Sequence, residues 1–179
     1  MISKIEARML GKTMRKAISE QDKINKEQII TKEFLSLPEV AFATNICVYL
    51  PINSEVDTKE IIKELLNQNK ILFAPVTKGD DMYAVRYTGS DELVVGNFGI
   101  SEPKGDVFSK EKLDLIVVPM VAFNQNKARV GYGKGYYDRF IPENAITVGV
   151  AFCEQQFDFE PQSFDKTLDI IVTDKGVLR

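Results

Sequence analysis

The sequence predicts an α/β fold, a three-layer α/β/α sandwich with a mostly parallel central sheet, in a single domain over residues 1–179. Apolar residues make up 44% and charged residues 27% of the chain, as in soluble globular domains that build one core. Segments with a helical spacing of apolar residues alternate with short apolar runs. These runs are typical of buried strands and lie at residues 45–50, 71–76, 113–119, 146–151 and 168–172.

Two helices are expected before the first strand. Apolar residues recur at helical spacing over residues 2–18, with basic residues between them. Ser19, followed three residues later by Asp22, resembles a capping signal for a second helix, whose apolar side continues to Leu35. Pro38 stands just past the end of that helix.

A strand, a helix and a second strand are expected over residues 45–76. Residues 45–50 are almost uniformly apolar, as in a strand buried on both faces, and Pro51 ends the run. Asp57, followed three residues later by Glu60, indicates the start of a helix that leads to the strand at 71–76. Such a βαβ unit of about 30 residues implies a parallel strand pair with a right-handed crossover.

The middle of the chain is less regular. Residues 79–81 predict a turn, and residues 82–87 alternate enough for a half-exposed strand. Residues 88–110 are rich in Gly, Pro, Ser and charge, and we expect an excursion over the sheet rather than a second domain. After the strand at 113–119, a Gly-rich segment is expected to enter a short helix near residues 136–141.

Composition excludes several classes of function. The chain contains no histidine, which removes Ser-His-Asp and Cys-His catalysis and histidine proton shuttling. A net charge of −3 disfavours general nucleic-acid binding. Cys47 and Cys153 are interpreted as two buried free thiols. No apolar signal region and no run of about 18 apolar residues occurs, so we expect no membrane span and a cytoplasmic location.

The segment 129–139 concentrates groups that bind ligands. It contains three glycines, three tyrosines, three cations and a carboxylate: Arg129, Gly131, Tyr132, Gly133, Lys134, Gly135, Tyr136, Tyr137, Asp138 and Arg139. Glycines let the backbone approach a ligand, exposed N–H groups and cations bind phosphate, and tyrosines stack on planar rings. The spacing matches neither a Walker loop nor a dinucleotide fingerprint. A flexible turn is the alternative, but flexible linkers rarely carry this density of functional groups.

Residues 131–139, Gly-Tyr-Gly-Lys-Gly-Tyr-Tyr-Asp-Arg, resemble the signature of the 5-formyltetrahydrofolate cyclo-ligase family. The resemblance extends along nearly the whole chain through residues 45–58, 98–103, 113–119, 148–155 and 168–169. It implies an ATP-dependent cyclisation of 5-formyltetrahydrofolate to 5,10-methenyltetrahydrofolate with release of ADP and phosphate. In the implied mechanism the formyl oxygen attacks the γ-phosphate, and nitrogen 10 of the folate then displaces the phosphate. Mg²⁺ is implied as the metal cofactor.

The resemblance also implies roles for individual residues. Lys4 and Arg8 match positions that contact ATP phosphates, although the family usually has leucine where Ala7 stands. Leu50 and Glu55 match folate-contacting positions. The stretch from Arg129 to Tyr137 matches the nucleotide-binding region, with Arg129 and Lys134 as the catalytic cations and Gly131, Tyr132, Gly133, Gly135, Tyr136 and Tyr137 as its other contacts. Residues 132–136 are also implied to lie near the folate, and Asp138 and Asp169 match the two magnesium-associated carboxylates.

Plainer interpretations remain for several of these residues. Lys4 and Arg8 suit a solvated face of a basic helix, Leu50 suits a strand core, and Glu55 suits a charge near a helix N-terminus. Two other functions use a similar sheet and anion loop: a sugar-phosphate isomerase or transferase, and a non-catalytic module that senses nucleotide or folate. The expected assembly is a monomer or weak homodimer that binds folate and ATP and neither nucleic acid nor membrane.

Overall fold

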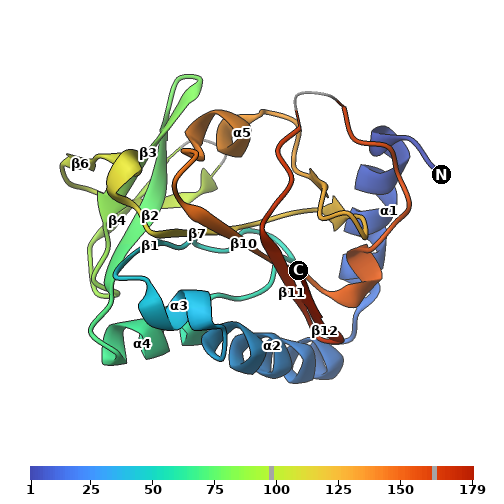
Figure 1. The fold of residues 1–179 in the computed structure, drawn as a ribbon, viewed down its shortest axis with the longest axis horizontal. Coiled ribbons are helices and arrows are strands. Elements are labelled where there is room, and N and C mark those ends of the chain that lie inside the picture. Colours follow the sequence, from blue (N-terminus) through green and yellow to red (C-terminus); the bar gives the residue numbers. More distant parts are fainter. Residues whose placement is uncertain (97–98, 163–164) are drawn as a thin grey trace.

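The computed structural model describes residues 1–96, 99–162 and 165–179, and its centre is an eight-stranded sheet (Figure 1). The strand order is β12-β11-β10-β7-β1-β2-β3-β6. The five inner strands are parallel: β11 (Ile170–Thr173), β10 (Ile146–Val150), β7 (Leu115–Val118), β1 (Asn45–Cys47) and β2 (Ile71–Lys78). Antiparallel strands complete the edges: β12 (Gly176–Leu178), β3 (Asp81–Arg86) and β6 (Val107–Phe108). The predicted mostly parallel sheet is confirmed.

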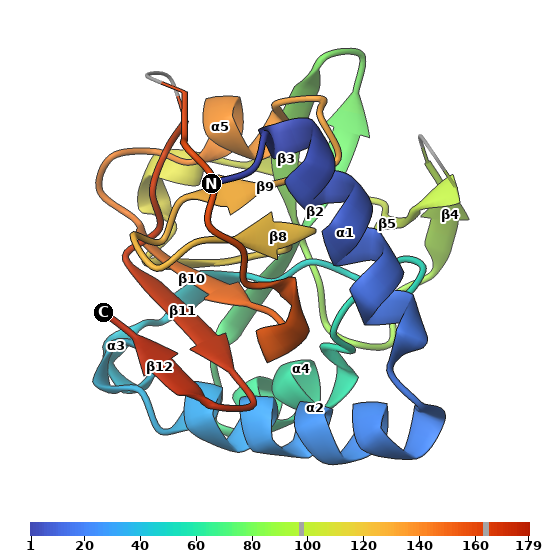
Figure 2. The same ribbon diagram turned by 90° about the vertical axis from the view of Figure 1, so that its right-hand side faces the viewer.

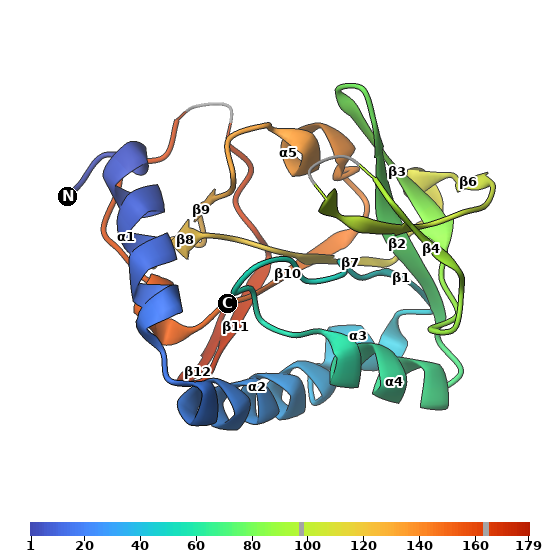
Figure 3. The same ribbon diagram turned by 180° about the vertical axis from the view of Figure 1, so that it is seen from behind.

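Helices cover both faces of the sheet, but unequally (Figures 1 and 3). One face packs against α2 (Glu20–Leu35), α3 (Pro38–Phe42) and α4 (Lys59–Asn67), and the other carries the five-residue α5 (Tyr136–Phe140). Alternate residues of β7 supply the two cores: Leu115 and Val117 face the larger helical layer, and Ile116 and Val118 face α5. Burial on both faces explains why these strands are uniformly apolar in the sequence.

The helix α1 (Lys4–Ala17) lies to one side of the sheet, against the small two-stranded sheet of β8 (Ala122–Phe123) and β9 (Arg129–Val130) (Figure 2). Ser3 and Glu6 form a capping box at its start. Ala7 is fully buried against small side chains of β8 and β9. A Cβ on Gly11 would lie 2.2 Å from the Val121 carbonyl oxygen, so only glycine allows this close approach.

The chain order creates a crevice between β1 and β7. From β1 the chain moves to β2 on one side, whereas from β7 it moves to β10 and β11 on the other side. Loops that leave the carboxyl ends of β1 and β7 therefore diverge. In open α/β sheets, ligands bind at such a switch point.

Several local predictions are confirmed and others are wrong. The Ser19 side chain caps α2 by accepting from the Asp22 N–H, and β1 and β2 form the expected parallel pair. The cap of α4 is Thr58 rather than the expected Asp57, although the Asp57 carboxylate accepts from the Lys59 N–H at 2.9 Å. Pro38 begins a short helix, because its missing N–H is harmless at a first helical position.

The excursion over residues 88–110 contains strands that the sequence pattern did not reveal. β4 (Leu93–Val95) and β5 (Ser101–Pro103) form a hairpin, and β6 joins the edge of the main sheet. A 3₁₀ turn, η2 (Lys110–Lys112), precedes β7. Phe98, the first residue of the segment 98–103 that resembles the family, lies outside the described residues.

Cys47 and Cys153 are both free, but only Cys47 is buried, and burial raises the pKa of its thiol to about 12. Cys153 is half-buried in η3 (Cys153–Gln155), so the expectation for it was wrong. Lys26 donates to Glu154 and Asp174 beside this thiol, both at 2.7 Å. Across the described ranges, no helix is long and apolar enough to span a membrane.

We expect Gly11→Ala to lower the free energy of unfolding by about 1–2 kcal/mol. Overpacking against a backbone carbonyl costs roughly 1–3 kcal/mol, which exceeds the roughly 1 kcal/mol that alanine gains in a helix. Urea unfolding measures the difference. Lys16→Ala on the exposed side of the same helix is the control and is expected to change stability by less than about 0.5 kcal/mol. A Gly11→Ala protein as stable as the parent would contradict the tight contact between α1 and Val121.

Candidate functional site

A pocket of about 830 Å³ opens at the carboxyl ends of β1 and β7. Tyr49 and Leu50 follow β1, and Pro119 follows β7, so the pocket lies at the switch point. Its walls come from α1, the 129–138 segment, β2, β3 and the loop that contains Glu55. This volume suits ligands of nucleotide or cofactor size.

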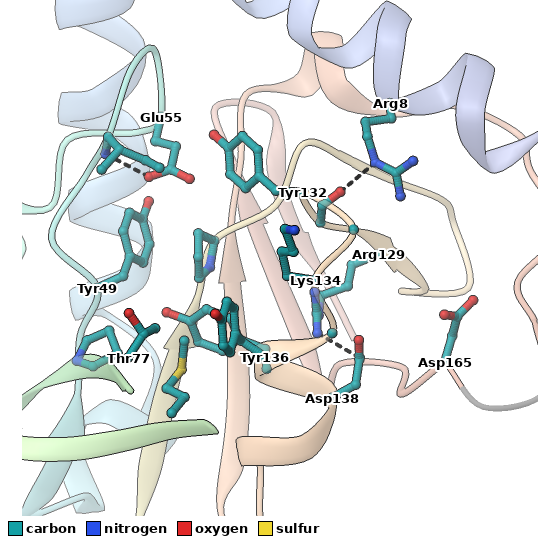
Figure 4. A pocket seen from close by; sticks show the side chains of 18 of the residues that line it. Arg8, Tyr49, Glu55, Thr77, Arg129, Tyr132, Lys134, Tyr136, Asp138 and Asp165 are labelled. Carbon is teal, nitrogen blue, oxygen red and sulfur yellow. Dashed lines mark hydrogen bonds and ion pairs between the residues drawn. The ribbon is translucent and has the colours of Figure 1, made fainter. Parts of the chain in front are cut away.

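The Gly-rich segment runs along the middle of this pocket (Figure 4). It follows β9 rather than a strand of the main sheet, and it ends at Gly135, the N-cap of α5. Gly133 and Gly135 have φ angles of +96° and +67°, a conformation that side chains with a Cβ rarely adopt. The loop therefore depends on glycine for its shape, while α5 is too short to contribute a large dipole.

One end of the pocket is rich in cations. The Arg8 Nε atom donates to the Gly131 carbonyl at 2.8 Å, which fixes α1 against the loop. Lys4, one turn earlier on α1, donates to the Asp165 carboxylate at 2.6 Å. Lys134 also lines the pocket. The structure thus brings three of the predicted phosphate-binding cations to one cavity, and their ligand contacts stay predictions.

Arg129 and Asp138 form a pair at 2.7 Å within the same pocket. The Arg129 side chain is 6% exposed, whereas the Asp138 side chain is 32% exposed. Among the described residues, the Arg129 Nε is the one buried side-chain nitrogen or oxygen with no hydrogen-bond partner. A buried donor without a partner costs free energy, so an incoming acceptor at this position would be favoured.

Asp138 is suited to hold Mg²⁺, whereas the structure does not bring Asp169 into the pocket lining. One part-exposed carboxylate beside the cationic end of the pocket suits Mg²⁺, which takes one or two carboxylates and fills its remaining positions with phosphate oxygens and water. Asp169 precedes β11 and accepts from the Thr147 N–H and hydroxyl, both at 2.7 Å. Its hydrogen bonds to Thr147 explain a carboxylate in an otherwise apolar run without a metal ion. The predicted pairing of Asp138 with Asp169 therefore has no geometric support.

Two residues of α5 hold a neighbouring hairpin. The Arg139 guanidinium donates to the Asp80 carbonyl at 2.6 Å, and the Tyr136 hydroxyl donates to the Gly79 carbonyl at 2.9 Å. Arg139 is absent from the pocket lining, and the expectation that it adds charge for polyphosphate stays a prediction. Its role in the structure is to hold the β2–β3 turn against α5.

The other end of the pocket contains a buried carboxylate among aromatic and apolar groups. Glu55 is 4% exposed, and its carboxylate accepts from the Ile52 N–H at 2.9 Å. Burial raises the pKa of Glu55, while the Ile52 N–H, the charge of Arg15 and the Tyr132 hydroxyl act to lower it. Figure 4 shows the Tyr132 hydroxyl facing Glu55, with Tyr49 nearby. This end can accept hydrogen bonds from a flat, donor-rich ligand.

The sequence pattern does not identify two buried residues at the site. Glu102 lines the pocket, and its carboxylate accepts from the Thr77 N–H and hydroxyl, both at 2.9 Å. Glu102 lies in the segment 98–103 that resembles the family, and this resemblance could have indicated a site residue. Arg15 is 3% exposed behind the pocket wall. Helical spacing from Lys4 and Arg8 places it on the same face of α1, but spacing alone does not show which cations are buried.

Comparison with known proteins gives consistent results. The 5-formyltetrahydrofolate cyclo-ligase family model matches residues 2–174. A 5-formyltetrahydrofolate cyclo-ligase from Haemophilus influenzae is 35% identical, covering 82% of this chain and 84% of that protein. The Escherichia coli enzyme of the same name is 30% identical, with 91% and 96% covered.

Solved structures agree in fold. The NMR structure of Aquifex aeolicus 5,10-methenyltetrahydrofolate synthetase aligns with a TM-score of 0.87 at 35% identity, covering 98% of this chain and 92% of that one. A Mycoplasma pneumoniae 5,10-methenyltetrahydrofolate synthetase aligns with a TM-score of 0.81 at 24% identity, over 97% of this chain and 99% of that one.

We expect Gly133→Ala to weaken the binding of inorganic tripolyphosphate about tenfold while the protein stays folded. A Cβ at this position would make only ordinary contact with Arg8, 3.7 Å from its Nη2, so the cost is backbone strain of roughly 1–3 kcal/mol that distorts the loop. Calorimetric titration measures the affinity. Gly176→Ala, in the β11–β12 turn at φ +127° with open space around it, carries similar strain and is the control. Parent-like affinity in Gly133→Ala would show that anion binding does not require this loop conformation.

Proposed function

The chain belongs to the 5-formyltetrahydrofolate cyclo-ligase family, and from this premise we propose that it converts 5-formyltetrahydrofolate to 5,10-methenyltetrahydrofolate with cleavage of ATP to ADP and phosphate. The observation that carries the proposal is one pocket with two different ends, cationic at Lys4 and Arg8 and acceptor-rich at Glu55. The Gly-rich loop runs between these ends. A reaction that transfers a phosphoryl group from ATP to a folate needs both ends in one cavity.

In this proposal the ATP phosphates occupy the cationic end. Lys4 and Arg8 approach from α1, and Lys134 and Arg129 approach from the loop. The unpartnered Arg129 Nε offers a donor to a phosphate oxygen. Gly131, Gly133 and Gly135 let the backbone come close to the phosphate chain, with Tyr136 and Tyr137 beside it.

The folate occupies the opposite end. The amino-pyrimidine edge of the pterin presents several N–H donors, and the buried Glu55 carboxylate is the acceptor for them. Leu50 provides apolar contact beside it, and Tyr132 lies between the folate and the nucleotide. The formyl group then points toward the loop and the γ-phosphate.

The proposed chemistry needs no side-chain nucleophile. The formyl oxygen attacks the γ-phosphorus and ADP leaves, which activates the formyl carbon. Nitrogen 10 attacks that carbon and loses its proton, and phosphate departs with the former formyl oxygen. Lys134 and Arg129 stabilise the charge on the transferred phosphoryl group, and the pocket holds the reacting atoms in line. A chain without histidine can therefore catalyse the reaction by positioning and electrostatics.

Magnesium would bind at Asp138. The ion supplies charge compensation for the transferred phosphoryl group when it is bound. Asp138 lines the pocket beside Arg129, so it can contact a nucleotide-bound cation directly or through water. Asp169 is not assigned to this site, because its carboxylate is engaged by Thr147 outside the pocket lining.

The decisive experiment is a spectrophotometric assay for methenyltetrahydrofolate from 5-formyltetrahydrofolate with and without Mg-ATP. We expect product only when both Mg²⁺ and ATP are present. Product formation without nucleotide, or ligand binding without turnover, would refute the proposed activity. A sugar-phosphate enzyme would need no ATP, and a sensing module would give no product.

We expect Asp138→Asn to lower turnover about a hundredfold and to raise the magnesium concentration needed for half-maximal rate. The substitution keeps the shape of the side chain and its ability to accept from Arg129, so the fold should survive. Turnover is measured across a magnesium titration. Glu143→Gln, which removes an exposed carboxylate beyond α5, is the matched control. Parent-like rates at every magnesium concentration would exclude a metal role for Asp138.

We expect Glu55→Gln to weaken folate binding by about tenfold to a hundredfold while ATP affinity stays near that of the parent. A hydrogen bond to a charged group contributes roughly 1.5–3 kcal/mol, and glutamine replaces one acceptor oxygen by a donor. Separate calorimetric titrations with folate and with a non-hydrolysable ATP analogue test this. Glu60→Gln on the exposed side of α4 serves as the control. Unchanged folate affinity would place the folate elsewhere.

A further inference from the structure

Arg15 is the buried cation behind the pocket wall, and it touches three separate segments of the chain. Its guanidinium donates to the Ser54 hydroxyl at 3.0 Å, to the Met120 carbonyl at 3.1 Å and to the Tyr132 hydroxyl at 2.9 Å. These partners lie on the loop after β1, on the connection after β7 and on the Gly-rich loop. One side chain therefore joins the two segments that diverge at the switch point to the Gly-rich loop.

This guanidinium is not a direct contact for a ligand in the pocket. Arg15 is 3% exposed, and it is absent from the pocket lining. Its influence must therefore pass through its partners. Two groups that line the pocket are within its reach: Tyr132 by a hydrogen bond and Glu55 by charge.

A buried guanidinium is costly unless hydrogen bonds and an opposite charge compensate it. The three acceptors of Arg15 are neutral oxygens, and the carboxylate that interacts with it is Glu55. Methionine has a similar volume and would fill the same space without charge. Packing alone would not require a cation at this position. The positive charge of Arg15 acts to lower the pKa of Glu55, which an apolar side chain would not do.

Charged and titratable groups face Glu55 from every neighbouring element. Arg15 comes from α1, Lys23 from α2, Tyr132 from the Gly-rich loop, Tyr49 from the end of β1 and Tyr137 from α5. The two cations favour the ionised carboxylate, and of these Arg15 has the stronger effect. Of the three phenols, Tyr132 can donate to the carboxylate, whereas the Tyr49 hydroxyl donates to the Val56 carbonyl at 2.9 Å. The neutral phenols carry no positive charge.

We propose that Arg15 is a positioning residue for the folate end of the pocket: it holds Tyr132 beside Glu55 and supplies the buried positive charge that faces the Glu55 carboxylate where the substrate's amino-pyrimidine edge would bind. The inference rests on the proposed function, because it deepens the account of the folate site. Arg15 lies on the helix that also carries Lys4 and Arg8, so α1 supports both ends of the pocket.

The test measures folate and nucleotide binding separately over a range of pH in Arg15→Met, Arg15→Lys and Tyr132→Phe. Lys16→Met is the matched control, because Lys16 is the neighbouring cation on the exposed side of α1. The ligands are 5-formyltetrahydrofolate and a non-hydrolysable ATP analogue. The second measurement is the titration of Glu55 in the unliganded proteins by carboxyl NMR, assigned with Glu55→Gln.

In Arg15→Met we expect folate affinity near neutral pH to fall about tenfold and nucleotide affinity to change less than about twofold. The loss of a nearby positive charge raises the pKa of Glu55, so its carboxylate protonates at a higher pH than in the parent. Folate binding should therefore be lost at higher pH as the solution is acidified. Arg15→Lys is expected to keep the pH dependence of the parent but to bind folate more weakly. Tyr132→Phe is expected to shift the pH dependence of folate binding in the same direction as Arg15→Met. Lys16→Met is expected to leave that pH dependence unchanged.

An unmoved pH dependence in Arg15→Met, with folate and nucleotide binding weakened together, would overturn the proposal and leave Arg15 as a structural link. If Arg15→Met does not fold, Arg15→Lys and Tyr132→Phe still decide, because neither removes a charge from the interior. A parent protein that binds no folate would refute the proposed function instead. In that case an unchanged Glu55 titration in Arg15→Met would separately overturn the coupling of Arg15 to Glu55.

Discussion

The fit of α1 against the small β8–β9 sheet is the contact on which the pocket depends. Gly11 and Ala7 let this helix approach the backbone at Val121 and the small side chains of β8 and β9. That approach carries Arg8 to the Gly131 carbonyl and Arg15 to the Tyr132 hydroxyl. A helix held a few ångströms farther away would lose both bonds, and the Gly-rich loop would lose two of its supports. The small residues of α1 thus determine how closely Arg8 and Arg15 approach the Gly-rich loop.

The absence of histidine shapes the chemistry that this scaffold can perform. A pocket with cations, carboxylates and phenols stabilises and orients charged ligands well, but it lacks a group with an ordinary pKa near neutrality. The proposed reaction suits such a pocket, because both nucleophiles belong to the substrate. Burial raises the pKa of Glu55 above its ordinary value. Its environment, rather than its residue type, makes it sensitive to the charges around it.

The sequence predicts most of the sheet because its central strands are buried on both faces, which leaves uninterrupted apolar runs such as Leu115–Val118. It does not predict β8 and β9, because two-residue strands have no periodicity to detect. The Gly-rich loop is evident from composition, and the pocket indeed forms around it. The sequence does not show that Arg139 contacts the Asp80 carbonyl or that Asp169 contacts Thr147, because these partners are distant along the chain. Such long-range contacts have no signature in local spacing.

The charges of the unliganded pocket constrain how the ligands can enter. Lys4 is paired with Asp165 and Arg129 with Asp138, so these cations already have carboxylate partners. Phosphate groups that draw these cations away would leave the carboxylates without partners, and part-buried carboxylates without partners are costly. On the proposed function, a nucleotide that arrives with Mg²⁺ solves this problem, since Arg129 gains a phosphate while Asp138 gains a cation. Nucleotide without metal would leave Asp138 unpaired beside added negative charge. The pairing of Arg129 with Asp138 therefore gives a structural reason why metal and nucleotide should bind together.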